Sequence, residues 1–363
     1  MTIRRAARAV GLAIALGASS VLAVAQPAAA HSTGGLTPSN YKTVVRGISP
    51  AAPGVTVTTS DLGTRLRLTN HSRHEVTVLG YENEPYLKIG PRGVFVNMRS
   101  PAVYLNKSTI PSTSATVPQG YDAAAAPKWV QLSSTPAYRW HDHRAHWMGN
   151  GPPPAVQRNP GRSHTVIEGW KVPLRVDGAP ATITGDVVWV PGPSPWIWLL
   201  VAVALAAVVY FAGMTSAFRW VAVAALVALL FAVAIDLGGS WGGSTASAGS
   251  KVGASVYTGV AWIMGVSALV WMLLPSWRRA VPAVMFTGIV FVIVSGLGNI
   301  TALWKSQVPS SAGPDWARVA VVIALGVGTG LTILAARHLK PVGADIVAGP
   351  PARRRKLAQS AAR

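Results

Sequence analysis

The sequence contains no cysteine among its 363 residues. A domain exported from the cytoplasm would therefore have no disulfide to hold it and would depend on its own buried core. The absence of thiolate also narrows the chemistry of any metal site. Imidazole, carboxylate and thioether groups are the side-chain ligands that remain.

Acidic residues are scarce, since 12 Asp and Glu stand against 32 Lys and Arg, which gives a formal net charge of +20. Such a surplus is typical of nucleic-acid-binding proteins, but most of it lies at the N-terminus, between apolar runs and in the C-terminal run Arg353–Lys356. Residues 31–193 hold only 16 basic and 9 acidic residues. We therefore expect no nucleic-acid partner. The smaller surplus fits contact with anionic envelope polymers or lipid headgroups, and also simple solubility.

Common catalytic motifs are missing as well. The chain has no serine nucleophile elbow, no glycine-rich phosphate loop after a strand and no His-Glu-x-x-His helix. Gly326-Val327-Gly328-Thr329-Gly330 follows no βαβ pattern and instead predicts close packing of helices. Whether the protein is an enzyme stays open, and a non-enzymatic role is favoured over a metal-dependent oxidase or hydrolase.

The N-terminus has the pattern of a secretory signal. Three arginines, Arg4, Arg5 and Arg8, precede an apolar segment at 9–24 and the small-residue segment Gln26–Ala30. The sequence therefore predicts a signal peptide at 1–30, cleaved after Ala30, so that His31 begins the mature chain.

Residues 31–193 show short alternations of apolar and polar residues, bounded by Gly, Pro, Asn and Ser. This pattern is typical of half-buried antiparallel strands and predicts an extracytoplasmic, all-β sandwich-like domain. Turns are expected at 70–73 and 90–93, a long loop at 106–127 and an extended, non-helical path through the prolines at 152–154. The alternating segments are 55–58, 65–68, 75–78, 94–96, 165–167 and 182–184.

Five apolar runs follow within 194–339, each close to the roughly 20 residues that cross a bilayer. They cover about 196–214, 220–238, 255–274, 281–304 and 319–338. The predicted inner segments contain ten Lys and Arg and the predicted outer loops three, which agrees with the positive-inside rule. The sequence thus predicts a multi-pass cell-membrane protein with a five-helix transmembrane domain and a basic cytoplasmic tail at 340–363. Its Ala-, Gly-, Pro- and Arg-rich composition is typical of a bacterium with a high-GC genome.

Three of the eight histidines, His141, His143 and His146, fall within the nine residues from Trp140 to Met148. Imidazoles with a nearby thioether indicate a transition-metal site, with copper favoured and zinc less favoured. On a strand, His141 and His143 would share a face, and only a turn near Arg144 would bring His146 round. On a helical turn, His143 and His146 would share a face instead. Alternatively, these imidazoles hydrogen-bond to the backbone of a packed segment and bind no metal.

The predicted mature N-terminus could add a further ligand. A free terminal amine together with the His31 imidazole can chelate copper, so the predicted metal ligands are His31, His141, His143, His146 and Met148. Asp142 could accept a hydrogen bond that fixes a histidine tautomer. His71 and His74 are more typical of surface turns.

Two features resemble the periplasmic copper-resistance (CopC-like) β-sandwich proteins: a histidine directly after the signal, and the segment Ser49–Gly54, which is similar to a Ser-x-Pro-Ala-x-Gly turn. The resemblance implies a β-sandwich that handles copper. The chain departs from that family because it lacks an early Met-rich run and adds apolar spans.

Together these patterns predict a membrane-anchored extracytoplasmic protein that binds or delivers a metal, copper favoured. Its partners would be the lipid bilayer and another membrane protein or a copper-handling protein. The alternative is a metal-independent cell-envelope protein whose outer domain binds a membrane-protein partner or a cell-wall polymer.

Overall fold

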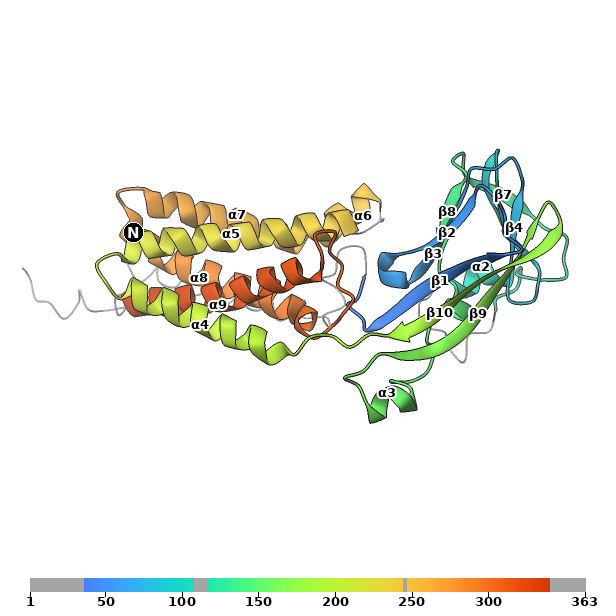
Figure 1. The fold of residues 1–363 in the computed structure, drawn as a ribbon. Helices are drawn as coiled ribbons and strands as arrows, with labels where there is room; N and C mark the ends of the chain where they lie inside the picture. Colours follow the sequence, from blue (N-terminus) through green and yellow to red (C-terminus); the bar gives the residue numbers. More distant parts are fainter. Residues whose placement is uncertain (1–35, 108–116, 244–246, 340–363) are drawn as a thin grey trace, which may run out of the picture. The chain divides into compact units, whose positions relative to one another are not determined.

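The computed structural model describes residues 36–107, 117–243 and 247–339, which form an N-terminal β-domain and a C-terminal helical region (Figure 1). The predicted signal peptide, His31 and the basic tail lie outside the described residues. The β-domain and the helical region are described separately below.

The β-domain contains two antiparallel sheets, as a sandwich-like fold requires. One sheet has seven strands in the order β1-β10-β9-β4-β5-β6-β7, and the other has three in the order β2-β3-β8. The strands are β1 (Tyr41–Ser49), β2 (Val55–Ser60), β3 (Arg65–Asn70), β4 (Val76–Leu79), β5 (Pro85–Gly90), β6 (Gly93–Asn97), β7 (Trp129–Ser133), β8 (Ala137–Trp140), β9 (His164–Val176) and β10 (Ala179–Trp189).

Alternate residues of these strands form the core of the β-domain. Leu66 and Leu68 of β3 are fully buried, while Arg67 between them is exposed, which is the period-two pattern of a half-buried strand. The six predicted alternations all fall on strands, at β2, β3, β4, β6, β9 and β10. Gly90 pairs with Gly93 at the end of β5 and β6, which confirms the predicted turn.

The connections between strands agree only partly with the sequence predictions. After the short helix α2 (Pro101–Leu105), residues 117–128 are irregular, as expected for a long loop. The expectation that the prolines at 152–154 exclude a helix was wrong, because α3 (Pro154–Arg158) begins at the last of them. Proline is tolerated at the first helical position, where its missing N–H would have no intrahelical partner.

The helical region contains α4 (Pro195–Gly213), α5 (Phe218–Gly243), α6 (Ala248–Ala254), α7 (Val256–Leu273), α8 (Val281–Phe291) and α9 (Pro314–His338). A 3-10 turn, η5 (Trp277–Ala280), precedes α8, and a π-helical turn, η6 (Val292–Gly296), and a 3-10 segment, η7 (Leu297–Leu303), continue it. Four helical segments are long and apolar enough to cross a membrane: 195–213, 218–242, 277–303 and 314–338. The third predicted span, 255–274, corresponds to α7, whose apolar helix at 258–273 is shorter.

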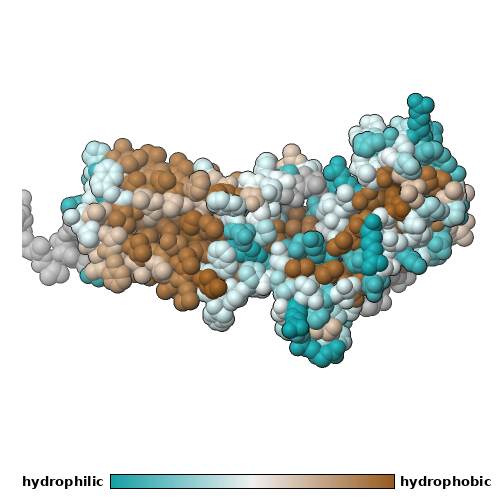
Figure 2. All heavy atoms as spheres, viewed as in Figure 1, coloured by the Kyte–Doolittle hydropathy of each residue, from teal (hydrophilic) through white to brown (hydrophobic). Residues whose placement is uncertain are grey.

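The surface of the helical region is strongly apolar. Figure 2 shows apolar residues spread over the outside of the helices, whereas the surface of the β-domain is mixed. On α4 alone, Trp196, Leu200, Val203 and Phe211 are each more than 60% exposed. Apolar surface on this scale requires an apolar solvent or partner, so the helical region has the character of a multi-pass membrane protein.

Candidate metal centre

The histidine segment begins where β8 leaves its sheet. Trp140, the last residue of β8, lies opposite Leu66 of β3 and is buried. The chain then enters a short 3-10 turn, η4 (His143–Ala145), whose N-terminus is capped because the Asp142 carboxylate accepts a hydrogen bond from the Arg144 backbone N–H. This is the turn near Arg144 that the strand interpretation required in order to bring His146 towards His141.

An ion pair anchors this turn to the larger sheet. Asp142 is fully buried, and its carboxylate accepts hydrogen bonds from Nε and Nη2 of Arg144 at 2.8 Å each and from the Trp140 indole at 3.1 Å. The Arg144 guanidinium also donates to the carbonyls of Leu79, the last residue of β4, and of Gly80, and lies over the Tyr81 ring. Asp142 therefore holds the turn through Arg144, in place of the predicted role as acceptor for a histidine.

Two further hydrogen bonds fix the backbone of η4. The Tyr81 hydroxyl accepts from the His143 backbone N–H at 3.0 Å, and the Thr43 hydroxyl donates to the Ala145 carbonyl at 3.0 Å. Both partners are more than 60 residues away in sequence. No local pattern could have identified Tyr81 or Thr43 as supports of the histidine segment.

The His141 imidazole contacts the rings of both His143 and His146. The ring centroids of His141 and His146 are 4.5 Å apart and the two rings are nearly parallel, at 7°. The His143 ring meets the edge of His141 at 4.9 Å and 68°. The structure therefore brings together the three histidines of the predicted cluster. On a regular strand, the spacing of the three histidines would place His146 on the face opposite to His141 and His143.

The tautomer of His141 follows from its environment. Its Nδ1 lies 2.6 Å from the Thr64 carbonyl oxygen, and because a carbonyl can only accept, Nδ1 carries the proton. Nε2 then bears the lone pair, and this atom is buried without a hydrogen-bond partner among the described residues. Metal-bound histidines commonly show this arrangement, in which one ring nitrogen donates to a backbone carbonyl and the other ligates.

Burial keeps two of the rings neutral. Loss of solvation lowers the pKa of His141, and burial together with the neighbouring His141 lowers the pKa of His146 to about 4. The Nε2 atom of His146 is also buried, and the described part of the chain offers it no hydrogen-bond partner. Both rings are thus neutral near pH 7, which is the form that ligates metal.

The rings do not yet converge on one point. Across residues 36–107, 117–243 and 247–339, no three His, Cys, Asp or Glu side chains are arranged to hold a metal ion. The stacking of His141 and His146 explains this, because the lone pairs lie in the planes of two parallel rings and cannot meet. Shared ligation would require one ring to rotate about its Cβ–Cγ bond.

Of the other predicted ligands, Met148 follows His146 by two residues and His31 lies outside the described residues. Met148 is half-buried in the irregular segment after η4, and the ring contacts that define the cluster involve the three histidines alone. His71 and His74 are exposed in the turn before β4, as predicted, and His74 pairs with Asp177 at 2.5 Å.

Comparison with protein-family models, with curated proteins and with solved structures finds no match to the chain.

Proposed function

We propose that this chain is a multi-pass membrane protein whose extracytoplasmic β-domain binds copper at His141, His143 and His146. The observation that carries this proposal is the buried, unprotonated Nε2 of His141, which has no partner among the described residues while Nδ1–H donates to the Thr64 carbonyl. Leaving such an atom unsatisfied costs roughly 1–3 kcal/mol. A bound metal ion would replace the missing partner.

The composition of the cluster favours copper. Neutral imidazoles suit both copper and zinc, but the neighbouring Asp142 carboxylate is not available to join them, since it is engaged by Arg144 and Trp140. The thioether of Met148, two residues after His146, would add a soft ligand that favours cuprous ion over zinc. Rotation of the His146 ring out of its stack would direct both Nε2 lone pairs to one ion, and His31 with its terminal amine would supply further ligands.

The membrane region would hold this site at the outer surface of the membrane. We propose five spans, with α7 as the third, which places the β-domain outside and the C-terminal tail inside. At 1.5 Å per residue, the 18 residues of α7 make about 27 Å, slightly less than the roughly 30 Å of a hydrocarbon core. The excess of Lys and Arg in the inner segments supports this orientation. Delivery of copper to a membrane-bound partner is the role that such a tether would serve.

Titration of the full-length protein with copper tests the proposal. The purified chain in detergent, without an affinity tag that contains histidine, is titrated with cuprous and zinc ions against a competing chelator. We expect one copper site per chain that binds more tightly than zinc. The variant His141→Ala/His146→Ala should lose this site, whereas the matched control His71→Ala/His74→Ala, which removes two exposed histidines, should retain it.

Two results would reject the metal site. One is copper affinity that is equal in the two double variants; the other is no binding beyond that of an exposed histidine. Thermal unfolding of each variant without metal separates loss of ligands from loss of the fold. A supporting result requires that His141→Ala/His146→Ala unfolds cooperatively and still fails to bind copper.

A second candidate function is the metal-independent binding of an envelope component by the β-domain. A cavity in this domain, whose lining includes Trp140 and His141, favours it.

A further inference from the structure

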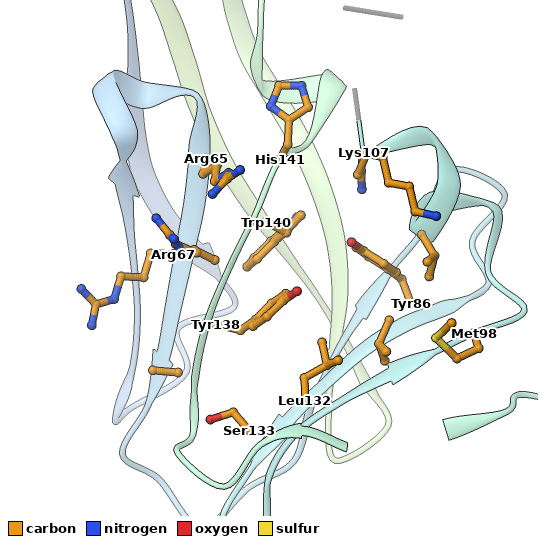
Figure 3. A pocket seen from close by; sticks show the side chains of 15 residues that line it. Arg65, Arg67, Tyr86, Met98, Lys107, Leu132, Ser133, Tyr138, Trp140 and His141 are labelled. Atoms are coloured by element: carbon orange, nitrogen blue, oxygen red, sulfur yellow. The ribbon is translucent and has the colours of Figure 1, made fainter. Parts of the chain in front are cut away.

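The β-domain contains a cavity of about 780 Å³ at the edge shared by β7 and β8. β7 is an edge strand of the seven-stranded sheet, and β8 is an edge strand of the three-stranded sheet. Only three residues connect the two strands. Residues of β3 and β8 border the cavity on one side and residues of β5, β6, β7 and α2 on the other. Figure 3 shows Tyr86 across the cavity from Tyr138 and Trp140. A volume of this size accommodates a small organic ligand.

The charge around the cavity has one sign. Arg65, Arg67, Lys107 and Arg139 line it, and the lining includes no Asp or Glu. Arg139 and Arg65 are partly neutralised by Asp61, at 2.8 and 3.5 Å. Arg67 and Lys107 are exposed and form no ion pair within the described residues. Two cations are therefore available to an anionic group at the mouth of the cavity.

Apart from Asn106, Ser133 and His141, the rest of the lining is apolar or aromatic. Tyr86, Tyr138 and Trp140 contribute rings, while Val96, Val103 and Leu132 contribute aliphatic surface. Leu132 is 45% exposed and Met98, which also lines the cavity, is 39% exposed. Apolar side chains that remain open to solvent beside a cavity favour a ligand with its own apolar part.

This combination selects among anionic ligands. Proteins that bind sugar polymers need several carboxylate or amide side chains for the hydroxyl groups, but Asn106 is the single such group in the lining. Inorganic anions need no apolar surface. We propose that the cavity binds an amphiphilic anion, in which a phosphate or carboxylate head group contacts Arg67 and Lys107 and an acyl chain lies against Leu132, Val103 and the aromatic rings.

The test uses the full-length chain in phosphatidylcholine nanodiscs and dodecyl phosphate as the probe, with heats corrected by titration of empty nanodiscs. We expect saturable binding, and Arg67→Gln/Lys107→Gln should weaken it about tenfold, the loss expected for two exposed charge-assisted contacts. The control Lys171→Gln/Arg175→Gln removes the same charge from exposed positions on β9, and it should leave the affinity within about twofold. Leu132→Ser should weaken binding of dodecyl phosphate as well.

Several outcomes would overturn the proposal. One is the absence of saturable binding, and another is equal weakening by the two double variants. The others are that inorganic phosphate binds as tightly as dodecyl phosphate, or that tri-galacturonate binds more tightly than dodecyl phosphate. The last of these would assign the cavity to an anionic glycan. Thermal unfolding of the variants checks that the fold is retained.

A further arm identifies the source of the head group if binding occurs. Phosphatidylglycerol added to the nanodiscs should compete with the probe if the natural ligand is a membrane lipid. If it does not compete, the ligand is a soluble amphiphile such as a free fatty acid, for which dodecanoate is the probe. Because His141 also lines the cavity, these titrations are run without metal, and the variants change Arg67 and Lys107, which take no part in the histidine cluster.

Discussion

Asp142 and Arg144 hold the histidine segment in place. The carboxylate is fully buried and the guanidinium largely so, and the pair makes two hydrogen bonds of 2.8 Å. Arg144 connects this pair to two carbonyls at the end of β4, so both charges are satisfied by fixed groups. A buried pair of this kind contributes little when intact, but removal of one partner leaves an uncompensated charge in the interior.

We predict that Asp142→Asn destabilises the β-domain by about 3 kcal/mol, since Arg144 would lose its counter-ion while remaining buried. Asp177→Asn is the matched control, because that carboxylate is exposed and pairs with His74 at the surface, and it should change stability far less. Thermal unfolding of the full-length protein, followed by near-ultraviolet circular dichroism, measures both. Equal effects would show that Asp142 is not the anchor of the turn.

Tyr86 makes the stability of the β-domain depend on pH in the alkaline range. Burial raises the pKa of its hydroxyl well above the ordinary value of 10. A group whose pKa is raised by folding contributes stability that is fully present below the unfolded pKa and is lost as pH rises above it. At about pH 11, this one group lowers the free energy of unfolding by about 1.4 kcal/mol relative to its value at neutral pH. Tyr86→Phe should therefore lose less stability than the wild type between about pH 9 and pH 11, as thermal unfolding would measure; an identical loss would contradict this.

At the scale of elements, glycines set how closely the helices approach. Gly326 and Gly330 of α9 face α4, where an added Cβ would lie 2.5 Å from the Ala202 carbonyl oxygen and 2.6 Å from that of Ala206. Gly288 of α8 faces Gly328 of α9 in the same way. The prediction that this glycine-rich segment serves helix packing is confirmed, because only residues without a side chain permit such contacts.

We predict that Gly330→Leu separates α4 from α9 and lowers the stability of the helical region by more than about 2 kcal/mol, since the obstacle is backbone. Ala336→Leu is the control, because Ala336 is exposed on the same helix and its enlargement should be tolerated. Thermal unfolding in detergent compares the two variants. If Gly330→Leu is as stable as Ala336→Leu, the close approach of the helices is not required.

At the scale of the whole molecule, the number of spans decides where each loop lies. The absence of cysteine allows single cysteines to be introduced without background. With five spans, Arg92→Cys in the β-domain and Ala312→Cys before α9 should react with a membrane-impermeant maleimide on intact cells, whereas Arg279→Cys after α7 should react only after lysis. If α7 does not cross the membrane, Arg279→Cys should react on intact cells and Ala312→Cys only after lysis, while Arg92→Cys still reacts on intact cells. The labelling pattern therefore distinguishes five spans from four.

The sequence alone located six of the ten described strands and the long apolar helices. Alternation of apolar residues located β2, β3, β4, β6, β9 and β10, because a half-buried strand must alternate. It did not reveal β5, whose residues are buried at nearly every position, nor β7, whose apolar residues are exposed. Long apolar runs located the helices, since composition decides whether a helix can face lipid.

Only the tertiary structure decided the arrangement of the candidate sites. The spacing of the histidines left two backbone interpretations open, and η4 resolved them because Leu79, Tyr81 and Thr43, which lie outside this turn, hold it by hydrogen bonds. The cavity depends on two strands being the outer edges of different sheets, which no local pattern encodes. Periodicity reports which residues face a core, whereas a binding site is formed by groups that the fold brings together from distant positions in the sequence.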